Sequence, residues 1–267
     1  MKITIAGCGN MGMIYARAFL KYNIVSAENM LLVEKSESRR DALRNMREGT
    51  ITLPGDDAIG ASDIIILAVK PQDFDSLADE LRKTVKPGNV IVSIMAGITM
   101  DYIANRLHTS KIVRAMPNSP AEFGMGITGY ACSPSLSISE IHKTENLLAA
   151  TGRTIFFESE EMLNAVTALS GSGPAYFFYI VKSMIEAGVK MGMTESVAAS
   201  LVKQTMLGSF HLLNNNEKSP DELIKAVASK GGTTEAALQV FDKSEIALNL
   251  QKGILAARDR GKELSRR

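Results

Sequence analysis

The sequence predicts an α/β protein with a parallel sheet in its N-terminal half and only helices in its C-terminal half. Strand and helix patterns alternate up to about residue 157, and the run 64–69 is apolar on both faces, as a central parallel strand must be. No β-branched strand run follows residue 161. Alternating strands and helices form parallel sheets with helices on both faces. We therefore expect two domains, at residues 1–159 and 160–267.

The elements of the N-terminal half follow from apolar periodicity and from turn residues. The expected strands lie at residues 3–6, 30–33, 64–69, 90–93, 111–115, 127–132 and 154–157. The expected helices lie at residues 11–22, 39–46, 71–84 and 139–150. Pro71 opens the third helix, because proline suits the first helical position.

The C-terminal half reads as a series of helices. They are expected at residues 174–191, 194–213, from 219 onward, 235–243 and 245–264. Ser219 and Glu222 form a capping box with Pro220 at the first helical position. The helix at 174–191 is apolar nearly all round, so it must be buried on most sides. In a half of only about a hundred residues, we expect a partner subunit to cover it.

Composition excludes several classes of protein. Hydrophobic residues make up 45%, charged residues 22%, and the net charge is +1, so no global field attracts nucleic acid or an anionic membrane. Two cysteines cannot build a disulfide framework. The N-terminus carries no signal-peptide pattern and no stretch of eighteen apolar residues exists. These features predict a cytoplasmic protein with no membrane segment.

A glycine-rich turn follows the first expected strand and opens the first expected helix. It matches the G-x-G-x-x-G pattern of Rossmann-type dinucleotide-binding domains. Its residues are Gly7, Cys8, Gly9, Asn10, Met11 and Gly12. The first glycine allows the tight turn, the second lets the backbone approach the pyrophosphate, and the third lets the helix pack close to the strand. The alternative is that these glycines only shape a turn and bind no dinucleotide.

The fingerprint also expects an acidic residue at the end of the second strand. Glu34 fills that position and is a candidate to bond the ribose hydroxyls. An exposed carboxylate without a ligand is the alternative. Cationic and polar residues that could hold a 2′-phosphate instead follow at once. They are Lys35, Ser36, Arg39 and Arg40.

Ligands in open α/β sheets bind beyond the carboxyl ends of the strands. That rule places Ala68, Val69, Lys70 and Pro71 beside the cofactor, and also Ala96 and Gly97. Lys70 has the alternative of being a surface lysine. His108, His142 and His211 have no metal-ligand spacing, so we expect no metal. Hydride transfer needs none, because the cofactor carries that chemistry.

Four segments together resemble the pyrroline-5-carboxylate reductases over essentially the whole chain, in order. They are Val-Lys-Pro-Gln at 69–72, Arg-Ala-Met-Pro-Asn-Ser-Pro at 114–120, Leu-Ser-Gly-Ser-Gly-Pro-Ala-Tyr at 169–176 and Ser-Lys-Gly-Gly-Thr-Thr at 229–234. The resemblance implies reduction of 1-pyrroline-5-carboxylate to L-proline with NADPH or NADH. It also implies a helical domain that dimerises by interlocking helices, with dimers that often assemble into decamers.

The resemblance implies site residues as well. Glu160 matches a family position near the substrate. Ser229, Gly232, Thr233 and Thr234 match a substrate loop that completes a site next to the partner's cofactor, and Thr234 bonds the imine nitrogen. The residues agree with this, because Gly-Gly-Thr-Thr precedes an expected helix whose N–H groups would bind a carboxylate. A helix cap with no ligand is the alternative.

Two positions depart from the family pattern and bear on cofactor preference and catalytic efficiency, and two other functions stay open. Lys230 stands where the family usually has proline, and Glu34 where it often has a neutral polar residue. One alternative is a reductase of the β-hydroxyacid dehydrogenase type, in which Lys182 or Lys190 would be catalytic. Another is a non-catalytic paralogue that binds the nucleotide without turnover.

Overall fold

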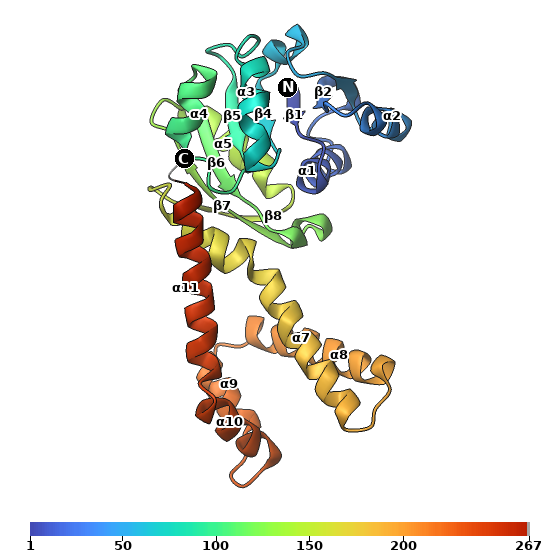
Figure 1. The fold of residues 1–267 in the computed structure, drawn as a ribbon, viewed down its shortest axis with the longest axis vertical. Coiled ribbons are helices and arrows are strands. Elements are labelled where there is room, and N and C mark those ends of the chain that lie inside the picture. Colours follow the sequence, from blue (N-terminus) through green and yellow to red (C-terminus); the bar gives the residue numbers. More distant parts are fainter. Residues whose placement is uncertain (266–267) are drawn as a thin grey trace. The chain divides into compact units, whose positions relative to one another are not determined.

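The computed structural model describes residues 1–265, which form two compact units (Figure 1). The first unit comprises residues 1–172 and the end of the chain from residue 257, and the second comprises residues 173–256. The units divide after residue 172, whereas the domain boundary is predicted after residue 159. Residues 266–267 lie outside the described part of the chain. Residues 160–172 pack on the sheet, since the side chain of Val166 lies 2.8 Å from where a Cβ on Gly129 would stand.

The first unit is built on one eight-stranded sheet with the order β3-β2-β1-β4-β5-β6-β7-β8. Its strands are β1 Ile3–Ala6, β2 Met30–Val33, β3 Thr50–Thr52, β4 Ile64–Leu67, β5 Val90–Ser93, β6 Ile112–Met116, β7 Gly126–Cys132 and β8 Gly152–Phe156. Every residue of β1, β4 and β5 is buried, as the continuous apolar runs predict.

The expectation of a purely parallel sheet holds for β1 to β6 and is wrong for the next strand. β7 runs antiparallel to β6, and β8 is parallel to β7. The connection between β6 and β7 holds only a 3₁₀ turn at Ser119–Phe123. A parallel crossover needs a dozen or more residues, so this short connection can only reverse the chain.

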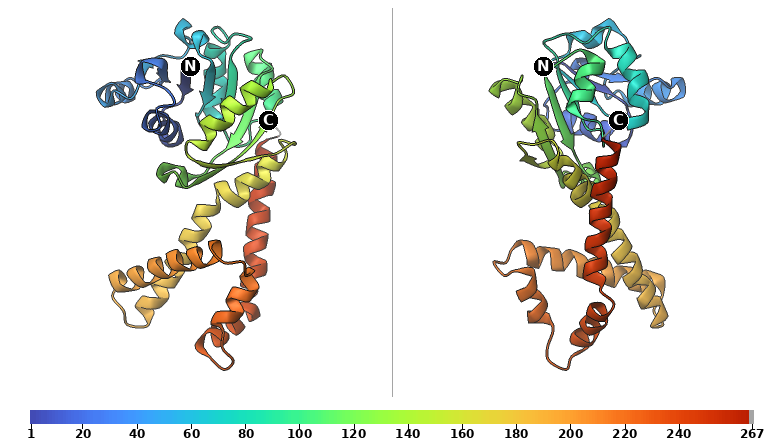
Figure 2. Two further views of the ribbon diagram at one scale, coloured as in Figure 1. Left: turned by 180° about the vertical axis from the view of Figure 1, so that it is seen from behind. Right: turned by 60° about the vertical axis from the view of Figure 1, so that its left-hand side comes forward.

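Helices cover both faces of the sheet, as expected for alternating strands and helices. On one face, α1 (Asn10–Lys21) and α5 (Ile138–Ala149) share a core with the sheet. On the other face, α3 (Phe74–Leu81) and α4 (Met100–Leu107) form a second core. Figure 1 shows α3 and α4 in front of the sheet, and the view from behind in Figure 2 shows α5 on the opposite face.

The apolar periodicity of the sequence does not predict the short elements. It misses β3 and α4, which have three and eight residues, and α6 (Met162–Val166), which leads into a π-helical turn at Thr167–Gly171. A 3₁₀ turn at Pro71–Asp73 precedes α3, where one continuous helix is expected. Windows this short hold too few residues to show a period. The remaining helix of this unit, α2, spans Glu37–Met46.

The second unit contains only helices, as predicted. They are α7 Gly173–Lys190, α8 Glu195–Asn214, α9 Pro220–Val227, α10 Thr233–Lys243 and α11 Ile246–Leu264, whose last turns belong to the first unit. The predicted capping box is confirmed, because the Ser219 hydroxyl accepts from the Glu222 N–H and the Glu222 carboxylate accepts from the Ser219 N–H. α7 and α8 pack closely where Gly188 meets the buried Ala198.

The single chain leaves the apolar side chains of α7 uncovered. Phe177, Phe178 and Tyr179 are 55%, 68% and 73% exposed. An apolar face of this size is unfavourable in water and marks an association surface. In residues 1–265, no helix has both the length and the apolar character needed to cross a membrane.

We predict that the protein associates into at least a dimer through α7. Phe178→Arg places a charge in that apolar surface and weakens association by at least about 2 kcal/mol, as is common for buried aromatic anchors. Size-exclusion chromatography with light scattering measures the effect. Glu28→Arg, at an exposed position of the first unit, is the matched control. A wild-type protein that is a uniform monomer at micromolar concentration contradicts the prediction.

Candidate active site

The glycine turn joins β1 to α1 at the carboxyl edge of the sheet. Gly7 has φ +105°, and a Cβ there would stand 2.7 Å from Ala68 C and Val69 N. Its N–H donates to the carbonyl of Val33 at 3.0 Å. Only glycine fits both this backbone conformation and this approach. The turn is therefore clamped between the ends of β2 and β4.

The other two glycines have different surroundings. A Cβ on Gly12 would stand 2.2 Å from the carbonyl oxygen of Gly7, so Gly12 lets α1 begin directly against the turn. Around Gly9, none of the described residues comes within 4 Å of a Cβ position. Gly9 is the N-cap of α1 and offers no capping side chain. Free N–H groups thus meet open space, which is the cradle that a phosphate requires.

A cleft of about 520 Å³ opens at this edge, between the ends of β1, β2 and β4. It brings together eight of the predicted cofactor residues, namely Gly7, Cys8, Gly9, Glu34, Lys35, Ala68, Val69 and Lys70. Predicted residues beside the cleft rather than on its lining are Asn10, Met11, Gly12, Ser36 and Pro71. These five begin α1, precede α2 or open the turn before α3.

Charges at the end of β2 form a linked group at the cleft. Glu34 accepts from the Ser36 N–H at 2.9 Å, and its other oxygen lies 3.5 Å from Arg39 Nε. Arg39 also donates to the Cys8 carbonyl. Arg40 does not line the cleft, and its Nη1 donates to the carbonyls of Glu34 and Lys35 at 3.2 and 2.7 Å. Of the two arginines expected to compete with Glu34, only Arg39 lines the cleft.

Cys8 lines the cleft with an uncharged thiol. Burial, with a smaller contribution from the neighbouring Glu34 carboxylate, raises the pKa of Cys8 to about 12, so the thiol is protonated at neutral pH. Its Sγ donates to the carbonyl of Val33 at 3.6 Å. The turn therefore presents no thiolate to an anionic ligand.

The loop after β5 lies at the same edge but is covered. Gly97 has φ +75° and is buried, and a Cβ there would stand 2.9 Å from the Cβ of Leu264. Neither Gly97 nor Ala96 lines the cleft. These two predicted residues therefore lie at the same edge of the sheet without lining this cleft.

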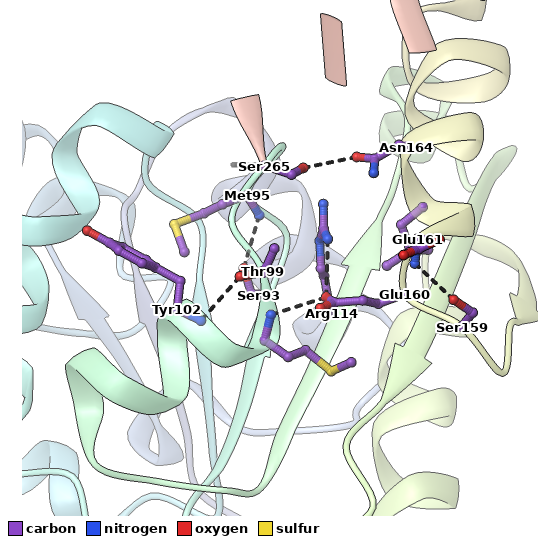
Figure 3. Close-up of polar contacts among 12 residues, drawn as sticks. Ser93, Met95, Thr99, Tyr102, Arg114, Ser159, Glu160, Glu161, Asn164 and Ser265 are labelled. Atoms are coloured by element: carbon purple, nitrogen blue, oxygen red, sulfur yellow. Dashed lines mark hydrogen bonds and ion pairs between the residues drawn. The ribbon is translucent and has the colours of Figure 1, made fainter. Parts of the chain in front are cut away.

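Glu160 lies just before α6, in the first unit, and faces Arg114 of β6 (Figure 3). Its Oε2 accepts from Arg114 Nη1 and from the Met100 N–H, both at 3.1 Å. Arg114 is only 1% exposed. One oxygen of Glu160 is therefore committed to protein partners.

The other predicted substrate residues lie in the second unit, around the start of α10. Gly232 is its N-cap, and a Cβ there would stand 2.6 Å from Ser229 Oγ, so a side chain would have to displace that hydroxyl. Gly231 has φ +73°, and its N–H donates to Glu235. Thr233 and Thr234 form the first turn of α10, which has no side-chain cap. Free N–H groups at a helix start can bind a carboxylate.

Sequence reasoning missed several residues of the site. Leu53 and Pro54 line the cleft, and they follow β3, which the periodicity does not reveal. Asp73 lines it too and lies 3.6 Å from Lys35 Nζ. Arg114 belongs to one of the four family segments, but its sequence context assigns it no role. A single charged residue inside an apolar strand pattern was the available signal for it.

Comparison with known proteins agrees with these features. The model of the family described as "Pyrroline-5-carboxylate reductase dimerisation" matches residues 160–264, and "NADP oxidoreductase coenzyme F420-dependent" matches residues 2–97. A pyrroline-5-carboxylate reductase of Staphylococcus epidermidis is 31% identical, with 99% of this chain and 98% of the relative covered. The chain belongs to the pyrroline-5-carboxylate reductase family.

Further members of the pyrroline-5-carboxylate reductase family extend this result. The Pseudomonas aeruginosa enzyme is 36% identical over 78% of this chain and 77% of its own. The Coxiella burnetii structure has TM-score 0.86 and 31% identity, with 99% and 98% coverage. The Plasmodium falciparum structure, with NADP bound, has TM-score 0.88 and 24% identity, with 99% of this chain and 98% of that chain covered. This likeness supports the fold. The predicted fold, an N-terminal Rossmann-type domain and a helical C-terminal dimerisation domain, is confirmed.

We predict that Gly9→Ala weakens binding of the dinucleotide without unfolding the protein. Its Cβ meets no described residue within 4 Å, but it occupies the space that the pyrophosphate needs. The Kd for NADPH rises by about tenfold or more, which corresponds to about 1.4 kcal/mol. Calorimetric titration measures it. Gly88→Ala, which has equally open space, is the control. Unchanged affinity in Gly9→Ala contradicts the assignment.

Proposed function

We propose that this protein is a pyrroline-5-carboxylate reductase that reduces 1-pyrroline-5-carboxylate to L-proline with NADPH or NADH, the last step of proline biosynthesis. The observation that carries this proposal is the 31% identity to an enzyme of that name over 99% of the chain. The glycine cradle supports it, because a Cβ would fill the space a pyrophosphate needs. The enzyme is an oxidoreductase that acts on a cyclic C=N bond.

In this proposal, residues 1–159 hold the cofactor and residues 160–267 provide substrate binding and dimerisation. The N-terminus of α1 holds the pyrophosphate, and Glu34, Lys35 and Ser36 meet the adenosine ribose. Ala68, Val69, Lys70, Pro71, Ala96 and Gly97 line the path of the remaining cofactor. When bound, the nicotinamide supplies a hydride to the imine carbon.

The substrate residues are Glu160, Ser229, Gly232, Thr233 and Thr234. Free N–H groups at the start of α10 bind the substrate carboxylate. The Thr234 hydroxyl donates to the ring nitrogen, which gains a proton as the carbon gains the hydride. Most of the rate then comes from positioning two reactants. The loop serves a site next to the cofactor of the partner subunit.

The assembly is a homo-oligomer, either a dimer or a decamer built from dimers. The exposed apolar side chains of α7 and the match to a dimerisation family support association. The site takes a small molecule. The net charge of +1 gives no reason for nucleic-acid or membrane binding. We place the protein in the cytoplasm.

A cofactor-oxidation assay with 1-pyrroline-5-carboxylate, run with NADPH and NADH in parallel, tests the proposed function. Substrate-dependent loss of absorbance at the reduced nicotinamide band is the expected result. Turnover of a hydroxyacid with none of the cyclic imine would favour the β-hydroxyacid dehydrogenase type instead. Lys182, which lies 3.0 Å from Glu186, or Lys190 would then be the lysine to test. Tight cofactor binding without turnover would favour a non-catalytic paralogue.

We predict that Thr234→Ala lowers kcat by about 10²-fold, because it removes a donor used in the transition state. The Kd for NADPH stays the same, since Thr234 belongs to the substrate loop. Steady-state kinetics and cofactor titration measure both quantities. Thr234→Ser keeps the hydroxyl and retains most of the activity. Wild-type turnover in the alanine variant would show that Thr234 only begins the helix and takes no part in catalysis.

We predict that Glu34→Ser shifts the ratio of kcat/KM toward NADPH by about tenfold, or about 1.4 kcal/mol. The carboxylate repels a 2′-phosphate, and its removal frees Arg39 to bind one. Lys35→Ala moves the ratio the other way. Glu48→Ser, which removes a carboxylate paired with Arg17 at 2.9 Å, is the control. An unchanged ratio in Glu34→Ser would place Glu34 away from the ribose.

A further inference from the structure

Arg114 is a buried cation in the middle of the sheet. It lies on β6, it is 1% exposed, and its Nη1 donates to Glu160 Oε2 at 3.1 Å. Within residues 1–265, its buried Nε and Nη2 have no hydrogen-bond partner. A buried ion pair that is only half satisfied is a poor source of stability compared with apolar residues of the same volume. Stability alone therefore does not account for Arg114.

Glu160 connects Arg114 to the start of α4. The same Oε2 that accepts from Arg114 accepts from the Met100 N–H at 3.1 Å. Met100 is the first residue of α4, and Thr99 is its N-cap. Glu160 thus satisfies a free N–H of a helix sixty positions earlier in the chain, where the helix dipole also favours a carboxylate. The hydrogen bond from Arg114 holds that carboxylate in place.

The segment fixed in this way is the loop at residues 94–99, between β5 and α4. At its other end, the Ile94 N–H donates to the Leu67 carbonyl at 3.1 Å and the Met95 N–H to Ser93 Oγ at 3.3 Å. Gly97, in its middle, lies against Leu264. The Arg114–Glu160 pair is therefore the anchor of the C-terminal end of the loop.

The position of this loop in the sheet gives the anchor a functional meaning. Dinucleotides bind across the carboxyl edge of such a sheet, with the adenosine half at the end of β2. In the strand order of this sheet, a bound nicotinamide would lie beyond β4, β5 and β6, on the side where the loop leaves β5. The Arg114–Glu160 pair thus holds in place a loop that forms one wall of the hydride-transfer site.

We propose that Arg114 is a positioning residue for hydride transfer, acting through Glu160 on the loop at residues 94–99. This inference rests on the proposed reductase function. Arg114 does not touch the substrate, because its free nitrogens are buried under protein atoms. Its loss lets the loop shift, and misplacement by about 1 Å can lower a rate about 10²-fold.

The test compares Arg114→Met, Arg114→Lys and Glu160→Gln with the intact enzyme. In Arg114→Met, kcat falls by about 10²-fold while KM for 1-pyrroline-5-carboxylate and the Kd for NADPH change by less than about threefold. Arg114→Lys keeps a donor to Glu160 and recovers at least about tenfold of the loss. The double variant Arg114→Met/Glu160→Gln is no slower than the slower single variant, because the two residues act as one unit.

Lys111→Met is the matched control. Lys111 precedes β6 at the opposite edge of the sheet, and its Nζ lies 2.7 Å from Glu140, so the variant breaks an ion pair far from the loop. It leaves kcat unchanged. Thermal midpoints of all variants separate loss of fold from loss of rate. If Arg114→Met does not fold, a fall in kcat without a change in KM in Arg114→Lys carries the test.

Hydrogen exchange of residues 94–100, followed by mass spectrometry, gives a readout that needs no turnover. Faster exchange there in Arg114→Met, with unchanged exchange in Lys111→Met, is the expected result. A wild-type enzyme inactive on the cyclic imine refutes the proposed function, while the exchange still tests the anchor. Unchanged exchange, unchanged kcat in the folded Arg114 variants, or a rise in KM alone would overturn the positioning role.

Discussion

The close approach of the glycine turn to the end of β4 is the constraint on which the cleft depends. A side chain at Gly7 would collide with Ala68 and Val69, and one at Gly12 with the carbonyl of Gly7. Because no side chains intervene, α1 begins at the sheet edge with its N–H groups directed into open space around Gly9. The crevice between the ends of β1, β2 and β4 follows from this contact.

Two kinds of charge pairing serve this edge of the sheet. Arg39 and Lys35 are mostly exposed beside Glu34 and Asp73, so their contacts are weak and can be exchanged for contacts with a ligand. The Arg114 side chain is 2% exposed, so its pairing with Glu160 is screened little by water and is hard to break. The first arrangement suits the selection of a ligand, and the second suits the holding of a geometry.

The helical unit differs from the sheet unit, because by itself it buries very few of its side chains. Among its helices, α9 and α10 contain no buried residue, and α8 contains only Ala198. Its helices nevertheless carry strong local signals, such as the capping box at Ser219 and the glycine at position 192 with φ +93°. Local signals thus define each helix, while the stability of the unit depends on surfaces that a second copy would cover.

The sequence alone determined the fold class, the long helices, the buried strands and the glycine fingerprint, because each of these has a period or a turn chemistry within a few neighbouring residues. It placed eight cofactor candidates that the cleft does bring together. Only the tertiary structure decided the reversal at β7, the choice of Arg39 over Arg40, the covering of Gly97 by Leu264, and the pairing of Arg114 with Glu160. These last features join residues that lie far apart in the chain, or depend on which way a side chain turns, and no local pattern carries that information.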